Sequence, residues 1–279
     1  MRWTRSGRSA NLEDRRGMRL GGGMGIGIGG TVILLALSLI FGKDFLSMAG
    51  GGGDGGAVPA QDASPYVGTP EEEEAVLFMS AVLDDGQATW SRIFSQAGQQ
   101  YQDARMVVFK DATQTACGVG QSASGPFYCP GDQAVYLDLG FFQELHSRFG
   151  APGDFAQAYV VAHEIGHHVQ HLLGTDERMR AAQRQSPEDA NELSVRLELQ
   201  ADCYAGVWGH QTSGRVSLEA GDVEEGLNAA AAIGDDRIQR MGGGTISPES
   251  FTHGSSAQRV DWLRRGLESG RVENCDTFQ

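Results

Sequence analysis

Apolar residues recur at helical spacing through much of the chain after residue 70. Residues 71–94 begin with four acidic side chains and continue with apolar positions three and four apart, which predicts an amphipathic helix. Residues 155–173 predict a strong helix, closed by Gly174 at its C-terminal end. Further helices are expected at residues 139–149, 186–208, 222–241 and 256–267.

Strand signals are fewer and shorter. Residues 106–109 and 134–138 are apolar or alternating and predict two strands, while residues 118–125 predict a loop. The fold class is therefore expected to be α+β, helix-dominated with a small sheet, in one domain that spans residues 71–279.

Residues 20–42 carry no charged side chain, and this window is just long enough to cross a hydrocarbon core about 30 Å thick. Residues 1–19 are rich in arginine, so the positive-inside rule predicts a basic cytoplasmic N-terminus followed by a transmembrane anchor. Residues 43–70 are mostly Gly, Pro, Ala and Ser and predict a flexible linker. The body would then lie outside the cytoplasm.

Two other interpretations of this window remain. A cleaved signal peptide could end near Ser47 to Ala49, although Lys43 and Asp44 separate that site from the apolar run. A buried helix of a cytosolic fold fits poorly, because a glycine tract follows directly.

Charge is distributed unevenly along the 279 residues, whose formal net charge is −14. Residues 1–49 hold seven basic and three acidic side chains, which leaves 15 basic and 33 acidic ones for the rest. A body this acidic makes nucleic acid an improbable partner, because phosphate binding needs clustered Lys and Arg.

The four cysteines all follow residue 100, on the side expected to be exported. An even number there favours two disulfides over a zinc site, since no C-x-x-C spacing occurs. Of the three possible pairings we prefer Cys117 with Cys129, which closes a local loop, and Cys203 with Cys275, which ties the C-terminal tail to a core helix.

The residues His163 to His167 read H-E-I-G-H and lie inside the strongest predicted helix. Residues four apart share one helical face, so the imidazoles of His163 and His167 can converge on one metal ion. Glu164 is displaced by about 100° around the helix axis and lies beside such a metal, where it can take a proton from bound water. The alternative is a set of polar residues on a solvated helix face.

A catalytic zinc ion needs a third protein ligand and an open position for water. Glu198 and Asp202 are four apart in an otherwise apolar segment, and buried carboxylates need a cation or hydrogen-bond donors. We therefore predict Glu198 as the third metal ligand and Asp202 as acceptor for a histidine N–H.

Several nearby side chains offer competing interpretations. Glu192 and Arg196 are also four apart, so the same helix could simply carry a structural ion pair. His210 is a weaker candidate ligand. His168 and His171 are expected at the surface or the rim of a pocket, because a straight helix cannot bring a third histidine onto the same ion.

H-E-x-x-H followed by E-x-x-x-D on a later helix resembles the gluzincin arrangement. More narrowly, the chain resembles the putative neutral zinc metallopeptidases of bacteria, a family of N-terminally anchored proteins. The resemblance rests on the Arg-rich start with its apolar run, residues 125–142, the helix with His163, residues 198–208, and the C-terminal blocks at residues 252–259 and 275–278.

This resemblance implies a zincin-like metallopeptidase domain in which Asp202 orients His163 and residues 134–138 form the edge strand beside the cleft. It also implies that His253 acts as a donor to the oxyanion, although a plain loop histidine is an equally good interpretation.

The expected function is that of a zinc-dependent endopeptidase with one Zn2+ per chain. Its partners would be an extended protein or peptide substrate and, through the N-terminal helix, the membrane. A zinc-stabilised, non-catalytic envelope protein that binds or assembles others is the alternative. A hydrolase of a non-protein amide fits the same residues, because that reaction needs the same activation of water.

Overall fold

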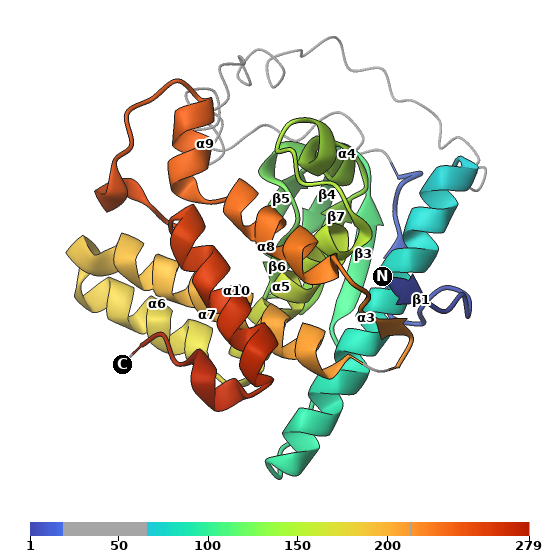
Figure 1. Cartoon of the computed structure of the whole chain (residues 1–279), viewed down its shortest axis with the longest axis horizontal. Helices are drawn as coiled ribbons and strands as arrows, with labels where there is room; N and C mark the ends of the chain where they lie inside the picture. Colours follow the sequence, from blue (N-terminus) through green and yellow to red (C-terminus); the bar gives the residue numbers. More distant parts are fainter. Residues whose placement is uncertain (19–65, 213, 279) are drawn as a thin grey trace, which may run out of the picture.

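A computed structural model describes residues 1–18, 66–212 and 214–278. The predicted transmembrane anchor at residues 20–42 and most of the predicted linker lie outside these residues. No helix in the described ranges is long and apolar enough to cross a membrane. The structure is α+β, as expected, with helices arranged around small sheets (Figure 1).

The first helix after the gap is α3 (Pro70–Gln96). Thr69 and Glu72 form a reciprocal capping box at its start, and three acidic side chains occupy the first turn, which satisfies free N–H groups and suits the helix dipole. The helix runs along one side of the molecule (Figure 1).

A four-stranded sheet follows the order β2-β3-β7-β6. The strands are β2 (Leu12–Asp14), β3 (Arg105–Phe109), β7 (Ala134–Asp138) and β6 (Phe127–Cys129). The first three are parallel and β6 is antiparallel to β7. Residues 134–138 were expected at the edge, which is wrong, because β7 lies between β3 and β6.

Residues 118–125 are not the simple loop that was predicted. β4 (Ala112–Thr115) and β5 (Gly118–Gln121) form an antiparallel hairpin, followed by the short 3-10 helix η1 (Ser122–Ser124). Helix α4 (Gly140–Ser147) then follows β7.

Helix α5 (Asp154–Leu172) is the centre of the molecule and packs against α3, α7 (Ala190–Gln211) and α8 (Asp222–Ala232). Its burial follows from an almost wholly apolar first half. Phe155 near its start stacks on Trp208 of α7, with ring centroids 6.0 Å apart, and both rings are fully buried. This contact joins the two helices that carry the predicted metal ligands.

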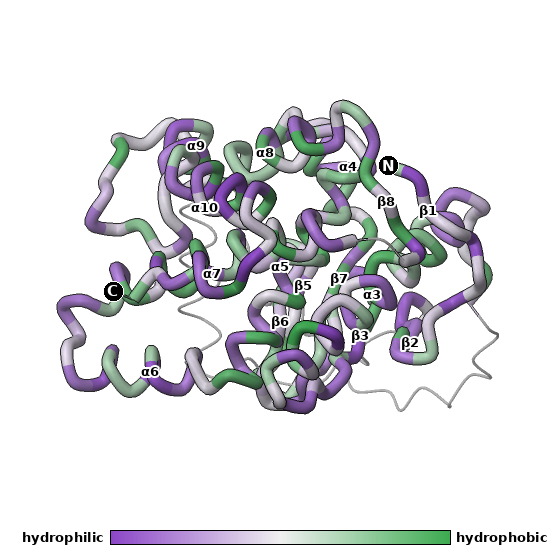
Figure 2. Tube along the Cα trace, turned by 60° about the horizontal axis from the view of Figure 1, so that its bottom comes forward, coloured by the Kyte–Doolittle hydropathy of each residue, from purple (hydrophilic) through white to green (hydrophobic). Residues whose placement is uncertain are grey.

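Two helical segments differ from the expectation. Helix α6 (Thr175–Gln185) was not predicted; it lies at the periphery and is largely hydrophilic (Figure 2). The helix expected at residues 222–241 is broken into α8 and α9 (Asp235–Met241), because Gly234 has an extended backbone with φ −70° and ψ 144°. The backbone of Ser256 packs so close to Gly234 that a Cβ there would lie 2.3 Å from its nitrogen. Helix α10 (Ser256–Ser269) and the 3-10 helices η2 (Pro187–Asp189), η3 (Pro248–Ser250) and η4 (Val272–Cys275) complete the chain.

The first 18 residues, here called the N-terminal strap, lie against the body of the domain. β1 (Arg2–Trp3) pairs antiparallel with β8 (Val216–Ser217), and β2 extends the main sheet beside β3. Residues 1–19 were expected to lie apart from the domain, across a membrane.

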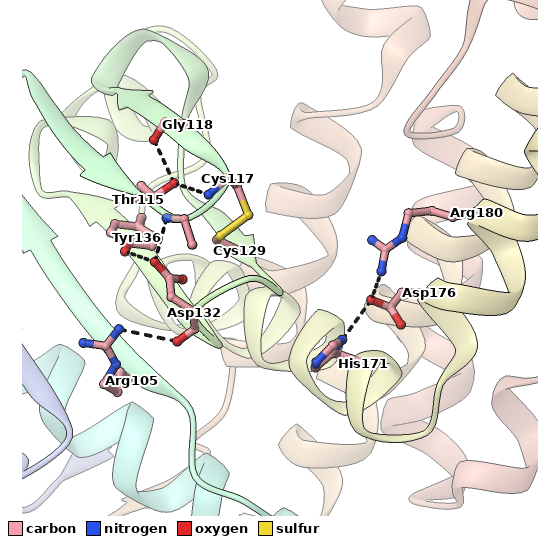
Figure 3. Close-up of a disulfide and its surroundings, with 11 residues drawn as sticks. Arg105, Thr115, Cys117, Gly118, Cys129, Asp132, Tyr136, His171, Asp176 and Arg180 are labelled. Atoms are coloured by element: carbon pink, nitrogen blue, oxygen red, sulfur yellow. Dashed lines mark hydrogen bonds and ion pairs between the residues drawn. A yellow bond between two sulfur atoms is a disulfide. The ribbon is translucent and has the colours of Figure 1, made fainter.

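Both preferred disulfides are present. Cys117 joins Cys129, which ties the β4–β5 hairpin to the end of β6 (Figure 3). Cys203 of α7 joins Cys275 of η4, and both are fully buried. The C-terminal tail is thereby fixed to the helix that carries Glu198.

Replacing Cys203 and Cys275 together with alanine is expected to lower the free energy of unfolding by about 2–5 kcal/mol. The cross-link spans 72 residues, against 12 for the other disulfide, so its loop-closure contribution is larger by about 1.5 kcal/mol. Denaturant unfolding of the two double variants measures the difference. An equal or greater loss on removing Cys117 and Cys129 would contradict this account.

Candidate metal centre

His163, His167 and Glu198 converge where α5 faces α7. One ligand atom from each lies within 4.8 Å of the others. The Nε2 atom of His163 is 3.2 Å from one carboxylate oxygen of Glu198, and the Nε2 atom of His167 is 3.4 Å from the other. The two imidazoles are perpendicular, with centroids 4.8 Å apart. Three donor atoms on two helices therefore face one point.

The opposite ring nitrogens are held by other side chains. Nδ1 of His163 lies 2.8 Å from Asp202, and Nδ1 of His167 lies 2.8 Å from the amide oxygen of Gln170. Both acceptors favour hydrogen on Nδ1, which leaves each Nε2 atom, facing Glu198, available for a proton or a cation. This is the arrangement that metal-binding histidines need.

Asp202 is fully buried and is the acceptor in a dense network. Arg259 of α10 donates to both of its oxygens, at 2.8 and 2.9 Å, and the Tyr159 hydroxyl donates at 2.6 Å. Burial opposes ionisation of Asp202, but Arg259 and His163 outweigh it and lower its pKa to about 2. Asp202 therefore stays a carboxylate and fixes the ring of His163.

Gln170 connects the site to the C-terminal disulfide. Its amide nitrogen donates to the backbone oxygen of Leu197 at 2.7 Å and to the Gln200 side chain at 3.1 Å. Gln200 in turn donates to the backbone oxygen of Cys275 at 3.0 Å. Because Leu197 precedes Glu198, this chain of bonds fixes α7 relative to His167.

Close packing of the two helices depends on Gly166, between the two histidines. A Cβ atom there would lie 3.0 Å from the backbone oxygen of Ala201 and 3.2 Å from its Cα. Glycine thus lets the main chains of α5 and α7 touch beside the three ligands.

The ionisable side chains of the site shift one another's pKa values. Burial opposes protonation of His163, but Asp202 and Glu198 outweigh it and raise its pKa to about 10. Burial also opposes ionisation of Glu198, yet the two histidines hold its pKa well below the usual range. A proton and a divalent cation therefore compete for the space between these side chains.

Glu164 is buried beside this group, with 7% of its surface exposed, and it lines the cleft. Burial is the main cause that raises the pKa of its carboxyl group. A carboxylate with a raised pKa is suited to accept a proton and to release it again.

A cleft of about 910 Å³ opens over these residues. β6 forms one wall, and its outer edge pairs with no other strand in the part of the chain that the structure describes. Pro126 and Pro130 flank β6, which limits that edge to three residues. The lining also includes His253, whose Nδ1 lies 3.2 Å from Asp235.

Two imidazole nitrogens and one carboxylate, with their outer atoms held by hydrogen bonds, match the three-ligand donor set of catalytic zinc sites. The family of putative neutral zinc metallopeptidases matches residues 1–278 of this sequence. The chain belongs to this family.

Relatives of this zinc metallopeptidase family member align with all or part of its length. Uncharacterized protein YpfJ of Escherichia coli strain K12 is 44% identical over 288 residues, which cover 100% of this chain and 99% of the relative. Uncharacterized protein Rv2575 of Mycobacterium tuberculosis is 46% identical over 189 residues, 64% of this chain and 63% of the relative. No solved structure matches the chain.

The structure thus brings together the predicted group of His163, Glu164, His167, Glu198 and Asp202. Tyr159, Gln170 and Asp235 were not predicted, and Arg259 was named only within a family-like block. Tyr159 and Gln170 had a usable signal, because each lies one helical turn from a histidine predicted to bind metal.

The other candidate residues have separate roles. His168 is fully buried, not at a rim, and bonds to Tyr128 at 2.9 Å and to the backbone oxygen of Gln102 at 2.6 Å. His171 bonds to Asp176 at 3.0 Å (Figure 3). His210 bonds to the backbone oxygen of Leu267 at 2.7 Å.

Proposed function

We propose that this protein is a zinc-dependent endopeptidase that binds one Zn2+ through His163, His167 and Glu198. The observation that carries the proposal is the convergence of two Nε2 atoms and one carboxylate beside the buried Glu164. A Zn2+ ion bound there supplies Lewis acidity and lowers the pKa of a bound water to about 7.

Glu164 acts as the general base in this proposal. It accepts the proton of the attacking water and then delivers it to the departing amine, as its position beside the ligands and its raised pKa allow. Asp202 holds His163 in the tautomer that keeps Nε2 free.

His253 is proposed as the donor to the oxyanion that forms on the peptide carbonyl. Its imidazole lines the same cleft, and the hydrogen bond with Asp235 raises its pKa, which favours the protonated form that can donate. Asp235 also accepts the backbone N–H groups of Thr252, His253 and Gly254, which fixes the loop.

The substrate is proposed to be a protein or peptide in extended form. The free edge of β6 offers backbone groups to which such a chain can pair, and the cleft beside it holds several residues of substrate. The domain is proposed to act on the outer side of the cell membrane. Two disulfides support an oxidising compartment.

The full-length protein, purified in mild detergent, is expected to contain about one zinc per chain by elemental analysis. It should cleave an unfolded protein or a mixed peptide library near neutral pH, and a chelator should stop the cleavage. Adding zinc back should restore it. Stoichiometric zinc without cleavage of any peptide would favour the zinc-stabilised binding protein instead.

A further inference from the structure

The N-terminal strap is bound to the domain by backbone hydrogen bonds at both of its ends. The Thr4 N–H donates to the Arg215 oxygen at 2.8 Å, beside the β1–β8 pairing. The Arg15 N–H donates to the Val108 oxygen at 2.7 Å, which continues the parallel pairing of β2 with β3. The strap is therefore part of two sheets.

Side chains of the strap are also built into the domain. Trp3 packs edge-on against Phe78 of α3, with ring centroids 5.5 Å apart. Ser9 is buried and donates to Asp84 of α3 at 2.5 Å. Both contacts are with the outer face of the helix that begins the main body of the domain.

The side chain of Arg16 joins the strap to α3 through an ion pair. It is only 5% exposed, and it donates to Asp14 at 2.6 Å and to Glu73 of α3 at 2.7 Å. Its guanidinium also lies 5.0 Å from the ring centroid of Tyr66. A buried arginine that loses its carboxylate partner is costly, so the strap and α3 need each other at this position.

The chain leaves the strap and returns to the domain at one place. A Cβ atom at Gly17 would lie 2.7 Å from the Cβ of Tyr66, so these residues touch. A segment that crosses a membrane once has its two ends separated by a hydrocarbon core of about 30 Å. Contact between residues 17 and 66 of one folded unit does not allow that separation.

We propose that residues 1–18 stay docked on the domain and lie on the same side of the membrane as residues 66–278. Residues 19–65 then begin and end at a single face of the domain, where Met18 and Val67 are exposed. The topology differs from the expectation of a cytoplasmic N-terminus and an external domain. It is independent of whether the site hydrolyses peptides.

Labelling with a membrane-impermeant thiol reagent tests the topology in the full-length protein. Ser6→Cys reports on the strap and Glu268→Cys on the domain, and both positions are exposed. The two variants should be labelled alike, either both in spheroplasts or both only after the membrane is opened. Labelling of Glu268→Cys alone in intact spheroplasts would overturn the proposal.

Thermal unfolding tests the docking itself. Arg16→Ala and Glu73→Ala should each lower the Tm of the full-length protein by about 5–15 °C. The double variant should lose less than the sum, because the two residues share one interaction. The control Arg5→Ala, whose exposed side chain pairs with Glu74, should shift the Tm by less than about 2 °C. An unchanged Tm for Arg16→Ala, or additive losses in the double variant, would contradict docking.

Discussion

Glu164→Gln is expected to lower the rate of peptide cleavage by about 10²–10⁴-fold while the protein keeps its fold and its zinc. The carboxylate lies beside the three ligands and is not one of them, so an amide of the same shape preserves the packing. It cannot accept the proton of the attacking water. Steady-state cleavage of a peptide found in the library screen measures the loss, and elemental analysis measures the retained zinc.

The matched control for this variant is Glu177→Gln, an exposed glutamate on α6. It should cleave at the wild-type rate. Peptide binding by Glu164→Gln should persist, because the cleft walls are unchanged. If wild type and Glu164→Gln cleave equally, Glu164 is not the general base, even where zinc is present.

Glu198→Ala is expected to lose most of the bound zinc and, with it, the activity. Two histidines alone leave the ion without its only charged ligand, and the histidine pair loses the carboxylate that now faces both Nε2 atoms. Elemental analysis after dialysis against a weak chelator measures the loss. The control is Glu192→Ala on the same helix, whose exposed carboxylate pairs with Arg196 at 2.6 Å and should keep full zinc.

Asp202→Asn gives an intermediate result that separates ligation from orientation. Loss of an outer partner of a metal-binding histidine lowers the affinity for zinc by about 10–100-fold without abolishing binding.

Retention of full zinc in Glu198→Ala would remove Glu198 as the third ligand and would direct attention to another carboxylate of the cleft.

The convergence of the candidate metal ligands was predictable because its signals are local. The spacing of His163 and His167 fixes their common face on any helix, and Glu198 with Asp202 repeats that spacing in an apolar segment. The family match supports the same chemistry. Arg259, by contrast, reaches Asp202 from α10, and no spacing along the chain indicates a partner 57 residues away.

Other parts of the fold lacked a local signal. β6 has three residues between two prolines, too few to show alternation, so the sequence does not predict it. The expectation that β7 is the edge strand came from the family resemblance alone. α6 is polar on most of its surface and shows no apolar stripe. The arginines of the strap fit the positive-inside rule, but Arg16 is buried against Glu73, a contact only tertiary structure reveals.

The backbone contact at Gly166 fixes the distance between α5 and α7, and so the separation of the three candidate metal ligands. The two histidine side chains are also held, by Asp202 and Gln170. A cation that enters such a frame orders few side chains, so its binding costs little conformational entropy. Zinc fingers lose their fold when the metal is removed. The hydrogen bonds that hold His163 and His167 are made to Asp202 and Gln170, so we expect this fold to survive removal of the metal.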